Sequence, residues 1–221
     1  MTTTLSIDPP TFCLVTDRLR CGGRSLEDVV AQAVAGGAGM VQLRERDLSS
    51  DALFALAKRI REITRDRVLL FVNERVDVAL AVGADGVQLP ESGLPVDEVR
   101  SVAGDRLLIG RSVHDVEGAV AAEADGANLL IAGSVFATAS HPGHVPEGIE
   151  LLHELSESVG VPYLGIGGVT AENVGAVMEA GASGAAVITA VTESDDPRLA
   201  AHDLAGEISR TWAVAKATVR P

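Results

Sequence analysis

The strongest constraint on the fold of this chain is a repeated alternation of short apolar runs with longer amphipathic segments. Each run is followed by a turn, and most are then followed by a segment with apolar residues at spacings of three and four, the pattern of a strand followed by a helix. The runs are 12–15, 40–43, 68–71, 86–89, 107–110, 128–131, 163–166 and 185–188. The helix-like segments are 26–35, 50–64, 115–124, 149–159, 171–180 and 198–213, with shorter ones at 76–82 and 96–102.

The alternation gives eight strand-helix units. Dividing 221 residues among them leaves about 28 residues per unit, enough for a strand, a helix and two short loops. Similar glycine-containing turns precede the strands at 35–39, 82–86, 123–127 and 179–184. We therefore predict a (βα)8 TIM barrel, with one domain over residues 1–221 and its core at about 12–213. The alternative is an open doubly wound sheet, but its GxGxxG fingerprint does not follow the first strand.

The charge balance limits the partners of such a barrel. With 18 Lys and Arg against 31 Asp and Glu, the formal net charge is −13, which argues against nucleic acid or an anionic membrane. No apolar stretch reaches the roughly 18 residues of a membrane span. Cys13 and Cys21 form no ligand pattern and suit a reducing compartment. We expect a cytoplasmic protein with a small-molecule partner, and leave homo-oligomer formation open.

The carboxyl ends of the strands carry the chemistry of such barrels. After the second run, Gln42, Arg44 and Arg46 share one side of an extended chain, because side chains alternate along a strand. Two guanidinium groups at a barrel mouth predict an anion, with phosphate the natural choice. The alternative is that both arginines pair with Glu45 and Asp47 on a solvated loop.

The third and fourth strand ends offer few carboxylates. Asn73 and Glu74 follow the third run, where they would bind a magnesium-held phosphate or cap the next helix. The segment 90–93 adds only Glu91. Glu74 is therefore the candidate metal ligand, at a site with fewer acidic groups than hard cations prefer.

The fifth and sixth strand ends carry the titratable groups. Ser112 and His114 follow the fifth run, and Asp115 is placed to orient His114. The long irregular segment 133–146 is a candidate lid, whose two histidines are good proton donors near neutral pH. The polar residues of this segment are Ser134, Thr138, Ser140, His141 and His144.

The last two strand ends predict an anion site. Glycines allow backbone amides to approach a phosphate, and barrels commonly hold phosphate after strands seven and eight. Thr170 is expected to cap the helix that begins at residue 171. The predicted phosphate-binding residues are Gly165, Gly167, Gly168, Ile188 and Thr189.

Six segments together resemble a known family, the thiamine phosphate synthase superfamily, which includes the TenI-type thiazole tautomerases. The resemblance covers roughly residues 12–197, and it is closest to the TenI-type branch. It implies a TIM barrel of thiamine biosynthesis. Synthase members join a pyrimidine diphosphate to a thiazole phosphate with magnesium and release diphosphate, whereas tautomerases aromatise a carboxythiazole phosphate by proton transfer and need no cofactor. The segments are 42–46, 73–77, 83–89, 110–114, 133–138 and 165–170.

Carried over by position, the synthase pattern places two groups of residues around the substrates. Around pyrimidine and diphosphate it places Gln42, Arg44, Arg46, Asn73, Ser112, Thr138 and Ser140. Around the thiazole phosphate it places Gly167, Gly168, Ile188 and Thr189. The sequence departs from that pattern where the synthase has Lys for Arg46, Asp for Glu74, a magnesium-binding Asp for Gly93 and Lys for His141. The tautomerase branch has a proton-shuttling histidine where this chain has Ser134.

The leading prediction is a thiazole tautomerase-like enzyme that acts on a carboxythiazole phosphate. Its proton-transfer candidates are His141, His144, His114 and Ser134. One alternative is a thiamine phosphate synthase with magnesium at Glu74, and another is a phosphate-ligand binder or regulator without catalysis.

Overall fold

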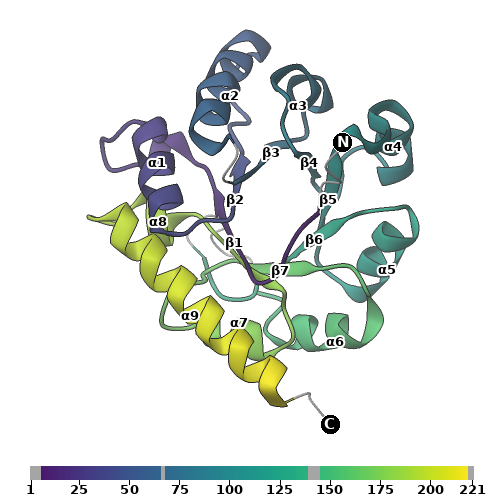
Figure 1. The fold of residues 1–221 in the computed structure, drawn as a ribbon. Coiled ribbons are helices and arrows are strands. Elements are labelled where there is room, and N and C mark those ends of the chain that lie inside the picture. Colours follow the sequence, from purple (N-terminus) through teal and green to yellow (C-terminus); the bar gives the residue numbers. More distant parts are fainter. Residues whose placement is uncertain (1–5, 66–67, 139–144, 219–221) are drawn as a thin grey trace.

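Parallel strands close into a complete barrel in the computed structural model, which describes residues 6–65, 68–138 and 145–218 (Figure 1). Each strand pairs with the next, and β1 closes the ring against β8. This confirms the predicted (βα)8 barrel. The strands are β1 (Thr11–Val15), β2 (Met40–Leu43), β3 (Leu69–Asn73), β4 (Gly86–Leu89), β5 (Leu108–Val113), β6 (Leu129–Ala132), β7 (Tyr163–Ile166) and β8 (Gly184–Val187).

Helices surround the barrel, and the long α9 crosses the outside against α1 and α7 (Figure 1). The four-residue α8 and two short 3₁₀ helices, 18–20 and 104–106, were not predicted, since they are too short to show a period. Among the described residues, no helix combines the length and hydropathy of a membrane span. The helices are α1 (Leu26–Gly36), α2 (Ser50–Thr64), α3 (Val76–Val82), α4 (Val96–Ala103), α5 (Val116–Ala124), α6 (Glu150–Ser158), α7 (Val174–Glu179), α8 (Thr189–Thr192) and α9 (Pro197–Thr218).

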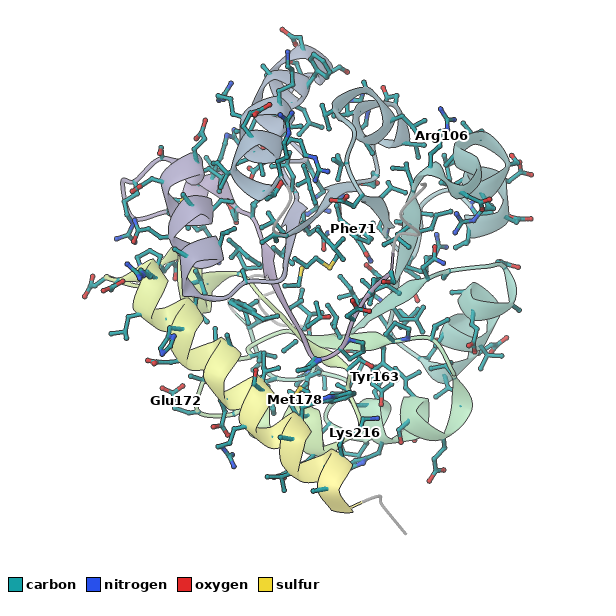
Figure 2. All side chains as sticks on the ribbon, in the orientation of Figure 1. Phe71, Arg106, Tyr163, Glu172, Met178 and Lys216 are labelled. Atoms are coloured by element: carbon teal, nitrogen blue, oxygen red, sulfur yellow. The ribbon has the colours of Figure 1, made fainter. Side chains whose placement is uncertain are left out.

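Two separate apolar layers form the core, because successive strand residues face opposite sides of the sheet. The larger layer lies between the strands and the helices, and the smaller one fills the barrel interior. Phe71 is the largest side chain of the interior layer and points toward the barrel centre (Figure 2). Its Cα partner on β4 is Gly86, where an added Cβ would lie 2.5 Å from the Phe71 ring. A glycine on one strand therefore leaves space for a ring on its neighbour.

Candidate active site

A pocket of about 570 Å³ opens at the carboxyl ends of the strands. This volume lies within the usual range for small-molecule sites. Both sequence-predicted arginines and the residues after β7 and β8 line the same pocket. The predicted residues among its lining are Gln42, Arg44, Arg46, Asn73, Glu74, Ser112, His114, Ser134, Thr138, Gly167, Gly168, Ile188 and Thr189.

Gly165 does not line this pocket, so its predicted phosphate contact is corrected. It lies within β7, and a Cβ built there would meet Val177 at 2.7 Å and Leu152 at 3.2 Å, on the helix side of the sheet. Gly167, by contrast, lies past the end of β7 and lines the pocket. The predicted residues Ser140, His141 and His144 lie outside the described part of the chain.

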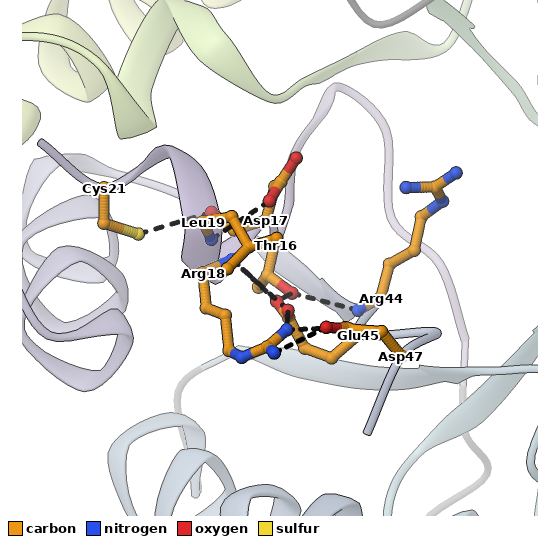
Figure 3. Close-up of polar contacts among 8 residues, drawn as sticks. All are labelled: Thr16, Asp17, Arg18, Leu19, Cys21, Arg44, Glu45 and Asp47. Atoms are coloured by element: carbon orange, nitrogen blue, oxygen red, sulfur yellow. Dashed lines mark hydrogen bonds and ion pairs between the residues drawn. The ribbon is translucent and has the colours of Figure 1, made fainter. Parts of the chain in front are cut away.

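A buried carboxylate organises the ends of β1 and β2 (Figure 3). The Thr16 hydroxyl donates to Glu45 Oε1 at 2.7 Å and accepts the backbone N–H of Arg44 at 2.9 Å. Glu45 also accepts the backbone N–H of Arg18 and one of its guanidinium nitrogens, each at 3.1 Å. The Arg18 guanidinium makes two further bonds of 2.6 Å to Asp47.

This cluster decides between the two interpretations of the β2 arginines. Arg18 pairs with both Glu45 and Asp47, so the expectation that Arg44 and Arg46 would pair with those two carboxylates is wrong. Figure 3 shows the Arg44 guanidinium extending away from the cluster. The Thr16 hydroxyl instead fixes the Arg44 backbone, which leaves the guanidinium directed into the pocket lining.

The two arginines form the cationic side of the pocket. Arg44 is half-buried, and burial, followed by the charge of nearby Arg46, lowers the pKa of its guanidinium. It nevertheless stays protonated at neutral pH, because the ordinary pKa of arginine is above 12. Neither guanidinium forms an ion pair within the described residues. The charges of Asp17, Glu45 and Glu74 act on Arg44 from nearby, but no carboxylate in the described part of the chain pairs with it directly, so the two adjacent cations attract an anionic ligand.

A directed chain of amides borders the cationic side. Gln42 Nε2 donates to Asn73 Oδ1 at 2.9 Å, and Asn73 Nδ2 donates to Glu74 Oε2 at 2.9 Å. Gln42 Oε1 is buried and has no hydrogen-bond partner among the described residues. Glu74 adopts a left-handed φ of 60°, and its backbone N–H donates to the Gln88 carbonyl at 2.9 Å. Such strained backbone in a non-glycine residue is typical of functional sites.

Asn73 and Glu74 do not cap the helix that follows them, which was one of their two predicted roles. Arg75 occupies the N-cap of α3 and makes no side-chain cap bond. The side chains of Asn73 and Glu74 face the pocket instead.

The carboxylates at the pocket define what metal it could hold. Glu91 is paired with His114 at 2.9 Å, and Gly93 contributes no side chain. Among the described residues, no group of three or more His, Cys, Asp or Glu is arranged to hold a metal ion. Magnesium is often bound through one or two carboxylates plus substrate phosphates. Glu74 therefore fits a magnesium ion carried mainly by a phosphorylated ligand, and does not fit an all-protein site.

His114 lines the pocket, but its partner differs from the prediction. Asp115 accepts the backbone N–H of Gly118 at 2.7 Å and caps α5, as Asp commonly does at a helix start. The His114 ring bonds Glu91 through Nδ1, at a position where both side chains are about half exposed. The expectation that Asp115 orients His114 is therefore wrong.

Two consecutive glycines shape the opposite side of the pocket. Gly167 and Gly168 have φ values of 101° and 62°. A Cβ at Gly168 would lie 2.5 Å from the Ala137 carbonyl oxygen, and one at Gly167 would lie 2.7 Å from Ser134 Cβ. Only glycine satisfies both the conformation and the space here.

Asn173, which was not predicted, holds the glycine turn in place. Its Oδ1 accepts the Thr170 N–H at 2.8 Å, and its Nδ2 donates to the Gly168 carbonyl at 2.9 Å. α7 accordingly begins at Val174 with Asn173 as its N-cap residue, so Thr170 does not cap a helix beginning at residue 171. An Asn before an apolar helical pattern is a recognised start signal and could have identified it.

The closed barrel and its pocket define the class, a (βα)8 barrel with a small-molecule site at the carboxyl ends of its strands. A family model described as thiamine monophosphate synthase (TMP-TENI) matches residues 12–191. The chain is 43% identical over 196 residues to thiamine-phosphate synthase of Haloarcula marismortui, covering 86% of this chain and 93% of that protein. It is 44% identical over 193 residues to thiamine-phosphate synthase of Roseiflexus castenholzii, covering 86% and 85%.

A solved structure agrees with these relatives. Thiamine phosphate pyrophosphorylase from Pyrococcus furiosus superposes with a TM-score of 0.83 at 36% identity, covering 91% of this chain and 96% of that one. The chain therefore belongs to the thiamine monophosphate synthase family. This confirms the resemblance found in the sequence.

Proposed function

We propose that the protein is a thiamine-phosphate synthase, which joins a pyrimidine diphosphate to a thiazole phosphate and releases diphosphate. The observation that carries the proposal is a single pocket of about 570 Å³ with two arginines on one side and a glycine turn on the other. Two anionic substrates need two such sides. The names of the relatives also favour this alternative over the tautomerase that the sequence first predicted.

Each side of the pocket has a separate task in this reaction. Arg44 and Arg46 bind the diphosphate and stabilise the charge that grows on it as its bond to the pyrimidine carbon breaks. Gln42 and Asn73, which are joined by a hydrogen bond, lie beside the arginines on the side proposed for the pyrimidine. The backbone around Gly167 and Gly168 orients the thiazole phosphate, which brings the two reacting rings together.

Magnesium, with Glu74 as its protein ligand, would neutralise further charge on the departing diphosphate. The metal requirement of this reaction is part of the proposal. Its support is that Glu74 lines the same pocket as Arg44 and Arg46.

Incubation of the protein with both substrates tests the proposal. Magnesium-dependent formation of thiamine phosphate, abolished by a chelator and restored by excess magnesium, is the expected result, measured by mass spectrometry. Arg44→Gln should reduce kcat/KM by about 10²-fold or more, the scale for loss of one donor that stabilises developing charge. The matched control is Arg59→Gln, which removes a surface arginine paired with Glu27 on α1. Folded wild-type protein that makes no thiamine phosphate would refute the proposal.

One observation favours a second candidate, the carboxythiazole phosphate tautomerase. His114 already occupies Glu91, and Gly93 offers no carboxylate, so metal ligands are few. The two arginines could bind a ring carboxylate equally well. Exchange of the ring proton for deuterium in the carboxythiazole phosphate, without pyrimidine or magnesium, would identify this activity. Binding of the thiazole phosphate without turnover in either assay would identify a non-catalytic binder.

A further inference from the structure

Gln88 lies beneath the pocket, next to one of its lining residues. It belongs to β4 and is 1% exposed, and its Nε2 donates to Ser112 Oγ at 3.1 Å. Ser112 lines the pocket, whereas Gln88 does not. The Oε1 atom of Gln88 is buried without a protein partner. Burying a carboxamide whose oxygen has no hydrogen-bond partner costs free energy. A polar group that is buried at such a cost is a candidate for a function, here through the bond that Nε2 makes to Ser112.

The barrel leaves a specific space for this carboxamide. Gly110 is the Cα partner of Gln88 on β5, and a Cβ there would lie 2.0 Å from Gln88 Oε1. The backbone carbonyl of Gln88 accepts the N–H of Glu74, so the same residue also supports the strained turn beside the arginines. The side chain is therefore accommodated in the barrel with its amide against the Ser112 hydroxyl.

The direction of the Gln88–Ser112 bond has a chemical consequence. A serine hydroxyl has one proton and two lone pairs. Because the Ser112 oxygen accepts from Gln88, its proton remains free to point into the pocket. The hydroxyl then presents a donor to whatever binds there.

We propose that Gln88 is a positioning residue, which sets Ser112 as a hydrogen-bond donor and so selects a ligand with an acceptor atom on that side of the pocket. The acceptor would be a ring nitrogen or a phosphate oxygen. The identity of the ligand rests on the proposed function, but the Gln88–Ser112 coupling does not. A site built to donate a hydrogen bond discriminates strongly against ligands that cannot accept it.

A double-mutant cycle tests this proposal. Gln88→Glu keeps the shape, and once ionised its carboxylate can only accept, so it accepts a hydrogen bond from the Ser112 hydroxyl and reverses the direction of the bond. We expect the Kd of the pyrimidine diphosphate, measured by calorimetry, to rise about tenfold, the scale of one hydrogen bond. In a Ser112→Ala background the same change should alter Kd less than twofold. Gln32→Glu on the surface of α1 is the control for the added charge.

The outcomes separate a positioning role from a structural one. Equal effects of Gln88→Glu in both backgrounds, or no effect in either, would overturn the proposal. If Gln88→Glu does not fold, Gln88→Met replaces it, and its effect on the Kd of the pyrimidine diphosphate must be lost in the Ser112→Ala background. Equal effects of Gln88→Met on Kd in both backgrounds would likewise overturn it.

A different result would refute the proposed function. If wild type binds the pyrimidine diphosphate without turning it over, the proposed function is wrong, but the double-mutant cycle still tests the role of Gln88. Wild type that binds neither substrate would count against both proposals.

Discussion

Replacement of Glu45 by alanine tests whether a buried carboxylate holds the cationic side of the pocket in place. Only 2% of its side chain is exposed, and it accepts from the Thr16 hydroxyl, the Arg18 amide and the Arg18 guanidinium. Removing Glu45 leaves these donors without their acceptor, and each buried donor left unsatisfied lowers the unfolding free energy by about 1–3 kcal/mol. Arg18 keeps Asp47 and is partly exposed, so we expect a total loss of about 3 kcal/mol in unfolding free energy.

That loss corresponds to a fall in melting temperature of about 6–12 °C for a domain of this size. Urea denaturation measures the free energy directly. We also expect the KM for the pyrimidine diphosphate to rise about tenfold, because the Thr16 hydroxyl that fixes the Arg44 backbone loses its acceptor. Asp47→Asn is the matched control, since 56% of the Asp47 side chain is exposed and exposed ion pairs contribute little to stability. The reasoning would be refuted if the unfolding free energy of Glu45→Ala lay within about 0.5 kcal/mol of wild type, or if Glu45→Ala lost no more unfolding free energy than the control.

Three further predictions follow from positions described above. Gly168→Ala should weaken thiazole phosphate binding by about tenfold or more in calorimetry, because its Cβ would meet the Ala137 carbonyl at 2.5 Å and its φ is 62°; unchanged affinity would remove the glycine turn from the site. Gly86→Ala should cost about 1–3 kcal/mol in urea denaturation through overpacking against Phe71, and a neutral result would contradict the described interior. Burial raises the pKa of the Cys13 thiol from 9.0 to about 12, so the unfolded chain ionises first and stability should fall as pH rises above 9 and through the folded pKa. Cys13→Ala should flatten that fall between pH 9 and 11, and an unchanged slope would show that the thiol does not contribute.

The elements of the fold could be predicted because their signals are local. β2, β4, α2 and α3 have the predicted bounds, since strand runs and helical spacing are each contained in one stretch of sequence. α7 begins three residues later than predicted, at Val174, because a single Asn173 side chain bonds the preceding turn. α8 has too few residues to show a period.

The members of the pocket could be predicted, but their partners could not. Strand alternation brings Gln42, Arg44 and Arg46 to the carboxyl end of β2, where all three line the pocket. The pairing of Arg18 with Glu45 joins residues 27 apart in sequence, and nothing in either segment identifies the other. The same is true of His114 and Glu91, which come from different loops.

In the barrel interior, two large side chains lie opposite glycines on the neighbouring strand. Phe71 faces Gly86 on the adjacent strand, and Gln88 faces Gly110 on the next, in both cases as direct register partners. A larger residue at the glycine position of such a pair therefore requires a smaller residue at its register partner. Among homologous chains, a side chain at position 110 should be accompanied by a shorter residue at position 88. Correlated substitution at these two positions in aligned sequences would be the trace of this steric constraint.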